Sequence, residues 1–127
     1  MSLLMRRREL MQSGGGEDKG WESGVKYDWS DKLIPNVYIL TTNGKESAYS
    51  SWSATDFLPC HGVRYLQRGA FMSIYNAFYD ENKSFIRSFG LGGDNSTVDV
   101  PANAYYFRLS DTTSKMNNAD RYIIPYE

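Results

Sequence analysis

The chain has 127 residues, enough for one domain with a buried core and a short tail. Its 14 Lys and Arg residues nearly balance its 15 Asp and Glu residues. This balance excludes a general attraction to nucleic acid or to an acidic surface. Aromatic residues are abundant, with 10 Tyr, 6 Phe and 3 Trp. Tyrosine in such numbers favours both β-strands and contact surfaces.

Cys60 is the only cysteine, so no disulfide can form within the chain. We expect its side chain to be a small buried apolar group. No apolar run approaches the roughly 18 residues of a membrane-spanning helix, and we therefore expect no membrane span.

Residues 1–12 combine good helix formers with three consecutive arginines. The segment is too short to be a stable isolated helix, so it needs a partner to become ordered. The arginines fit a solvated tail, a weak patch for anionic membrane or nucleic acid, or an anchor whose guanidinium groups pair with carboxylates of another protein. We favour the anchor, with residues 1–24 as anchor plus Gly-rich linker and residues 25–127 as the folded domain. The predicted anchor residues are Leu3, Leu4, Met5, Arg6, Arg7, Arg8, Leu10 and Met11.

The domain opens with a predicted β-hairpin. Residues 37–42 are β-branched and aromatic, and residues 48–52 form the return strand. Between them, Asn43 and Gly44 are a strong hairpin-turn signal. Pro59 then predicts a strand edge or a bulge, because proline cannot donate a ladder hydrogen bond.

The next predicted strands are residues 63–66 and 70–79. A polar turn at residues 80–83 follows, in which Asn82 is the expected left-handed residue. Residues 84–89 form the return strand.

The last predicted strands cover residues 97–100, 104–109 and 121–126, after an irregular loop at residues 90–96. About eight short strands with turn signals between them predict an all-β fold. Such spacing is typical of an antiparallel β-sandwich or jelly roll.

Strands 71–79 and 104–109 carry large apolar side chains on both faces. A strand with one solvated face would alternate more cleanly between apolar and polar residues. Either both faces are covered within the domain, or the outward face meets another subunit or a ligand. We favour a neighbouring subunit.

No catalytic constellation is visible in the sequence. His61 is the only histidine, and its neighbour Cys60 points to the opposite face if this segment is extended. A glycosidase-like carboxylate pair could come from four acidic residues: Asp80, Glu81, Asp94 and Asp99. Asp94, Asn95 and Asp99 could ligate calcium. Both sets are more simply explained as turn and loop residues. We expect no enzymatic activity, no metal and no cofactor.

Aromatic and polar residues nevertheless offer contacts for a sugar or a subunit. Sugar binding needs ring faces that stack on pyranose C–H groups, and Asn, Asp or Arg side chains that fix hydroxyls. The alternative is that the aromatic residues are core or cross-strand pairs. The candidate contact residues are Trp52, Tyr75, Tyr79, Asp94, Asn95, Tyr105 and Arg108.

Three segments in order carry a family resemblance: residues 55–59 (TDFLP), 78–86 (FYDENKSFI) and 97–110 (TVDVPANAYYFRLS). Together they resemble a module that recurs in tailed-bacteriophage tail, baseplate and fibre proteins. The N-terminal segment is similar to short heads of phage structural proteins that plug into a particle. This chain departs from the fibre pattern in lacking a shaft and a coiled coil.

The resemblance implies a carbohydrate-binding-like β-sandwich in a virion, made in the host cytoplasm. It also implies a homotrimer, because fibre-type proteins are usually threefold. Other phage structural proteins would bind residues 1–12, and host polysaccharide is the expected ligand if the domain binds one. The alternative is a free-standing lectin-like module of a bacterium.

Overall fold

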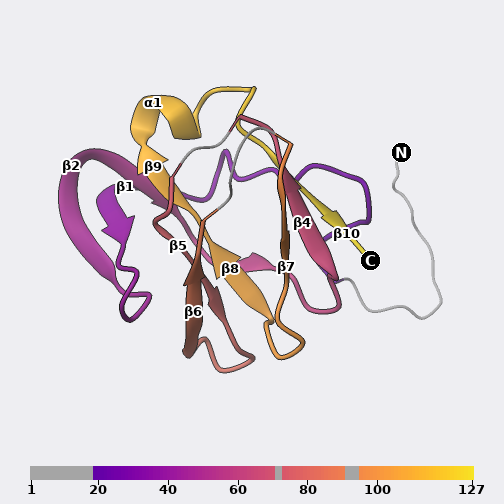
Figure 1. Ribbon diagram of the computed structural model, residues 1–127. Coiled ribbons are helices and arrows are strands. Elements are labelled where there is room, and N and C mark those ends of the chain that lie inside the picture. Colours follow the sequence, from indigo (N-terminus) through magenta and orange to yellow (C-terminus); the bar gives the residue numbers. More distant parts are fainter. Residues whose placement is uncertain (1–18, 71–72, 91–94) are drawn as a thin grey trace.

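The computed structural model describes residues 19–70, 73–90 and 95–127. The predicted anchor residues and Asp94 lie outside these ranges. The described part of the chain is built from short antiparallel strands and one single-turn helix, α1 (Thr113–Met116), which confirms the predicted all-β class (Figure 1).

Within these described ranges the strands form three antiparallel sheets. The first has the order β1 (Leu33–Ile39), β2 (Glu46–Thr55), β9 (Ser110–Thr112). The second has the order β3 (Leu58–Pro59), β8 (Tyr106–Arg108), β5 (Asn76–Tyr79), β6 (Phe85–Phe89). The third has the order β10 (Ile123–Tyr126), β4 (Tyr65–Arg68), β7 (Thr97–Asp99).

The first and second sheets are joined by chain segments that run through both. The segment β2–β3 lies antiparallel to the segment β8–β9, and Thr55 N donates to Leu109 O at 2.8 Å between the two sheets. From the pair Ala54–Ser110 to the pair Leu58–Phe107, the β2–β3 side has one residue more. An extra residue on one strand bends it, so the chain turns from one sheet into the other here.

A large core lies between the second and third sheets. It contains Phe78 of β5, Phe107 of β8, Leu66 of β4 and Ile123 of β10, all fully buried. Cys60 belongs to the same core and is fully buried, as the sequence predicts. Pro59 lies in the edge strand β3, where its missing N–H costs no ladder bond, which also confirms the prediction.

A smaller core lies on the other face of β5. There Ala77 and Tyr79 pack against Ile39 of β1 and Ala54 of β2. Strand β5 therefore has both faces covered by its own chain. The outward face for which we favoured a neighbouring subunit is occupied by the β1–β2 hairpin instead, so the sheet face around Tyr79 is not exposed.

Several strand boundaries differ from the sequence-based expectation. β5 begins at Asn76, and residues 73–75 precede it as irregular chain. The left-handed residue of the following turn is Lys83 (φ 64°), where Asn82 was expected. The reason is that Asp80 Oδ1 accepts hydrogen bonds from the backbone N–H groups of both Asn82 and Ser84, which fixes the loop around the aspartate.

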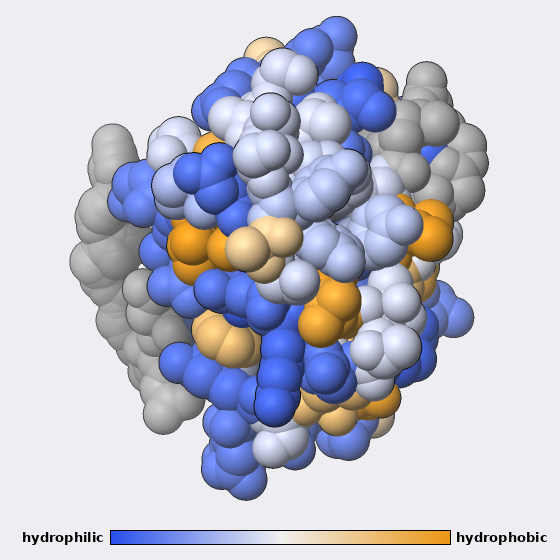
Figure 2. Space-filling view, turned by 90° about the vertical axis from the view of Figure 1, so that its left-hand side faces the viewer, coloured by the Kyte–Doolittle hydropathy of each residue, from blue (hydrophilic) through white to orange (hydrophobic). Residues whose placement is uncertain are grey.

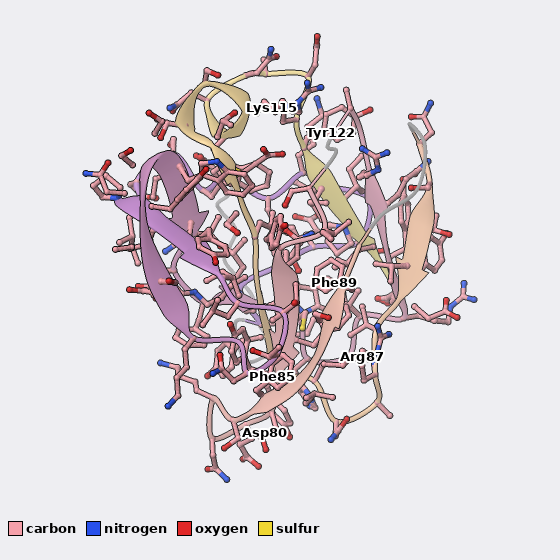
Figure 3. The ribbon with its side chains drawn as sticks, turned by 60° about the vertical axis from the view of Figure 1, so that its left-hand side comes forward. Asp80, Phe85, Arg87, Phe89, Lys115 and Tyr122 are labelled. Atoms are coloured by element: carbon pink, nitrogen blue, oxygen red, sulfur yellow. The ribbon has the colours of Figure 1, made fainter. Side chains whose placement is uncertain are left out.

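Figure 3 shows this Asp80 turn at the opposite end of the molecule from Lys115 in α1. The one-turn helix and strand β9 were not anticipated, because three- and four-residue elements carry almost no periodic signal in a sequence.

The end of the predicted linker contacts the domain. Gly24 N donates to Pro125 O at 2.8 Å, and the indole N–H of Trp21 donates to His61 O at 2.9 Å. The chain thus enters the domain beside the C-terminal strand β10.

Gly44 at the β1–β2 turn must be glycine for two reasons. It adopts φ +71°, and a Cβ atom there would lie 2.6 Å from Phe85 Cδ1 and 2.9 Å from Tyr79 Cε2. This confirms the predicted turn and adds a steric reason for glycine.

We expect Gly44→Ala to destabilise the protein by about 3 kcal/mol, because left-handed strain and overpacking of the smaller core act together. Gly24→Ala is the matched control, since Gly24 has φ +82° but no atom within 4 Å of the new Cβ. It should cost only about 1–2 kcal/mol, from backbone strain alone. Unfolding in denaturant measures the loss of stability in both variants. Equal losses for the two variants would show that the packing of the smaller core on Gly44 is unimportant.

Candidate functional site

Four aromatic rings gather on the outer face of the β1–β2 hairpin. Tyr38 comes from β1, Tyr49 and Trp52 come from β2, and Tyr75 lies just before β5. We call these four side chains the ring cluster.

The rings of this cluster meet edge to face. The ring centroid of Tyr38 lies 5.7 Å from that of Tyr49 and 5.4 Å from that of Tyr75. The Trp52 centroid lies 5.9 Å from both Tyr38 and Tyr49, and 5.5 Å from Tyr75. The ring planes of these pairs are inclined by 67° to 87°. Inclined rings at such distances are a favourable aromatic arrangement.

A large bulge in β2 brings Tyr49 and Trp52 to this place. In the ladder between β1 and β2, Pro35 pairs with Ser53 and Val37 pairs with Ala48, so residues 49–52 have no partner on β1. Bulges redirect side chains and are common beside functional sites. Two non-glycine residues in the bulge are left-handed, Asn36 (φ 63°) and Ser51 (φ 71°). Such backbone strain is found preferentially at binding sites.

Ser110 of β9 fixes Tyr75 beside the hairpin. Its hydroxyl donates to the backbone carbonyl of Tyr75 at 2.5 Å and accepts from the backbone N–H of Ile39 at 3.0 Å. Since Tyr38 is the neighbour of Ile39, one buried hydroxyl sets the position of two rings of the cluster.

The ring cluster lines a surface hollow of about 290 Å³. The hollow opens to solvent, with Tyr49 56 % exposed. Figure 2 views the molecule from the side of β1 and β2, and residues of intermediate hydropathy gather on this face among hydrophilic ones. Tyr, Trp and Ser have such intermediate hydropathy, and β2 is rich in them.

The polar ends of these rings are available for a ligand. Within the described part of the chain, neither the hydroxyls of Tyr38, Tyr49 and Tyr75 nor the indole N–H of Trp52 makes a hydrogen bond to protein. The cluster therefore offers partly exposed aromatic rings together with free hydroxyl and indole donors.

The sequence predicted two members of the cluster, Trp52 and Tyr75, as contact residues. It missed Tyr38 and Tyr49, although both lie in or beside strands that were expected. Their aromatic character was visible, but only the bulge at residues 49–52 aligns them with Trp52.

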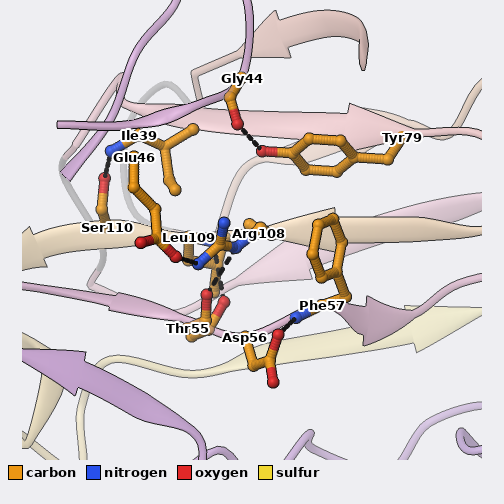
Figure 4. A network of polar contacts seen from close by, with 10 residues as sticks. All are labelled: Ile39, Gly44, Glu46, Thr55, Asp56, Phe57, Tyr79, Arg108, Leu109 and Ser110. Atoms are coloured by element: carbon orange, nitrogen blue, oxygen red, sulfur yellow. Dashed lines mark hydrogen bonds and ion pairs between the residues drawn. The ribbon is translucent and has the colours of Figure 1, made fainter. Parts of the chain in front are cut away.

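Tyr79 and Arg108 are the two predicted contact residues that the structure places in the interior, with exposures of 3 % and 4 %. The guanidinium of Arg108 donates to Thr55 O at 2.8 Å and to Glu46 Oε2 at 2.6 Å (Figure 4). The hydroxyl of Tyr79 donates to Gly44 O at 2.5 Å (Figure 4). Burial raises the pKa of Tyr79 to about 12, so its hydroxyl stays protonated. Both residues hold the hairpin and are not available to a surface partner.

The other predicted contact residues lie apart from the ring cluster. The ring of Tyr105 stacks on that of His61 at a centroid distance of 3.9 Å. Asn95 is exposed and left-handed (φ 63°), and its carbonyl accepts from Gln67 Nε2 at 3.4 Å.

Neither a metal-binding cluster nor a reactive thiol is found in the residues that the structure describes. Among residues 19–70, 73–90 and 95–127, no three His, Cys, Asp or Glu side chains come close enough to hold a metal ion. Burial raises the pKa of the Cys60 thiol to about 12, which keeps it protonated and unreactive. No helix in these ranges is long and apolar enough to cross a membrane.

Comparisons with known protein families, with curated proteins and with solved structures find no match to this chain.

The strained backbone at Ser51 gives a test of how the ring cluster is built. We expect Ser51→Gly to stabilise the protein by about 0.5–1 kcal/mol, because glycine relieves the left-handed strain at some cost in unfolded-state entropy. Ser50→Gly is the control, since Ser50 is also exposed but does not have positive φ. It should destabilise by about 0.5–1 kcal/mol. Thermal unfolding of the two variants should therefore shift in opposite directions, and a loss of stability in Ser51→Gly would contradict the assignment of strain.

Proposed function

We propose that the chain is a non-enzymatic structural protein of a tailed-bacteriophage virion, and that its ring cluster binds bacterial surface polysaccharide. The single observation that carries the proposal of polysaccharide binding is the partly exposed cluster of Tyr38, Tyr49, Trp52 and Tyr75 around one hollow. Contiguous aromatic patches on a protein surface commonly mark contact or ligand-binding sites. The free hydroxyl and indole donors around them match the hydroxyl groups of a sugar.

The arrangement of the termini supports attachment through the N-terminal segment. Residues 19–24 run beside β10, on the right in Figure 1, whereas β1 and β2 lie on the left. A particle attached through residues 1–12 would therefore leave the ring cluster on the far side of the domain. The virion setting and a homotrimeric state are supported by the resemblance of residues 55–59, 78–86 and 97–110 to phage modules.

The second candidate is a free-standing lectin-like module of a bacterium. It is favoured by the coverage of both faces of β5 within one chain, since a domain with complete cores needs no partner to fold. A monomeric protein that binds sugar and never associates with particles would support this alternative.

Substitution of Trp52 tests the binding site. On an array of bacterial surface polysaccharides, the full-length protein should bind, and Trp52→Ala should weaken this binding at least about tenfold by removing the central ring. Tyr65→Ala is the control, because Tyr65 is a half-buried ring of β4 that stacks on Tyr126. Its variant should bind like the wild type. No binding to any polysaccharide, or to millimolar sugar, would leave a purely structural role.

Deletion of residues 1–12 tests the anchor. The truncated protein should keep the unfolding midpoint of the full chain, because the described fold begins after this segment. It should no longer be found in purified particles when it replaces the full-length protein during infection. Replacement of Arg6, Arg7 and Arg8 by lysine, which keeps the charge but not the planar guanidinium, should reduce incorporation in part. Normal incorporation of the truncated protein would refute the anchor.

A further inference from the structure

The ring cluster has walls of an unusual composition for a site that takes a neutral sugar. Of the residues described, only Tyr38, Tyr49, Trp52 and Tyr75 line its hollow, and no carboxylate, carboxamide or guanidinium is among them. Sites for neutral sugars add such polar side chains to the ring faces, because each sugar hydroxyl needs a directed partner. Among the described residues, the walls consist of tyrosine and tryptophan alone, whose only polar groups are phenol hydroxyls and an indole N–H.

We propose that the ring cluster is a cation–π site for a quaternary ammonium group of the trimethylammonium type, carried by the surface glycan. The inference rests on the proposed function, because it concerns the same hollow and names the group that the hollow recognises. Aromatic faces attract such a cation through the ring quadrupole, and tryptophan does so most strongly.

The distances in the cluster suit one cation on several rings. A cation interacts with a ring when it lies within about 6 Å of the centroid. The centroids of Tyr38, Tyr49 and Trp52 are 5.7 Å to 5.9 Å apart, with planes inclined by 67° to 70°. A group seated over the middle of these three rings is therefore within range of all of them. The ring of Tyr75 adjoins both Tyr38 and Trp52, at centroid distances of 5.4 Å and 5.5 Å.

The faces of the cluster are not occupied by the protein's own cations. Lysine and arginine side chains cover several other rings in the described part of the chain: Trp21, Phe57, Tyr65, Phe78, Tyr106 and Tyr122. None of these contacts falls on Tyr38, Tyr49, Trp52 or Tyr75. No lysine or arginine in the described part of the chain thus competes with an external cation for these four rings.

Because the described walls contain no carboxylate, the hollow should bind methylated and unmethylated ammonium groups with different affinities. A primary ammonium carries three N–H donors that need acceptors when they leave water. A trimethylammonium group has no N–H donor, so ring faces alone can replace its hydration. The hollow should therefore prefer choline to ethanolamine.

Calorimetric titration of the full-length protein tests the proposal with four probes. Choline and tetramethylammonium should bind. Ethanolamine, and the neutral isostere of choline in which tert-butyl replaces trimethylammonium, should bind at least about tenfold more weakly. Equal binding of choline and its neutral isostere would show that charge is irrelevant and would overturn the proposal.

Substitutions of Trp52 test whether choline binds in the ring cluster. Trp52→Ala should abolish choline binding, and Trp52→Phe, which keeps a ring in place, should weaken it several-fold. Tyr65→Ala is again the control and should bind choline like the wild type. A choline affinity that survives in Trp52→Ala would place the site elsewhere and contradict the proposal.

Two further results separate this inference from the proposed function and from a lipid ligand. Binding of unsubstituted polysaccharide without binding of choline would refute the ammonium site and keep the polysaccharide function, whereas no binding of either refutes both. Retention on a polysaccharide that bears phosphocholine groups, without co-sedimentation with phosphatidylcholine vesicles, supports the glycan source. Co-sedimentation with vesicles without retention on the polysaccharide would overturn the proposal that a surface glycan carries the ammonium group.

Discussion

The buried guanidinium of Arg108 is the interaction on which the arrangement of the two cores depends. It lies on β8, in the middle of the second sheet, and reaches Thr55 O and the carboxylate of Glu46 at the two ends of β2. A buried cation is tolerated only when it is paired, so β2 must lie across this sheet. This contact keeps the hairpin on the face that Ala77 and Tyr79 present, and it closes the smaller core.

The position of the hairpin decides what its outer face becomes. Because neighbouring residues of a strand point to opposite faces, burial of Ile39 turns Tyr38 outward. Ser110 links Ile39 to Tyr75, and the bulge at residues 49–52 adds Tyr49 and Trp52. The ring cluster is thus a consequence of the smaller core, with two left-handed residues, Asn36 and Ser51, as the strained part of its frame.

Sequence reasoning was reliable where a local signal determines the backbone. The turn at Gly44 needs positive φ, and Pro59 tolerates only an edge strand. It was unreliable where an aromatic or charged side chain has two environments open to it. Tyr79 and Trp52 are both aromatic residues of predicted strands, but Tyr79 is buried and Trp52 lines the surface hollow. Arg108 was predicted as a contact residue because an arginine can fix sugar hydroxyls, but its bonds to Thr55 O and Glu46 hold it in the interior.

The sequence by itself determined the all-β class, the β1–β2 turn, the edge position of Pro59 and the burial of Cys60, since these follow from residue type and short-range pattern. The tertiary structure decided which side chains gather on the surface. It did so because the ring cluster depends on pairing between distant segments: β2 meets β9 near Trp52, and Ser110 holds Tyr75 next to β1. The alternation of apolar residues in one strand does not reveal which segment covers its second face, nor where a ladder will bulge.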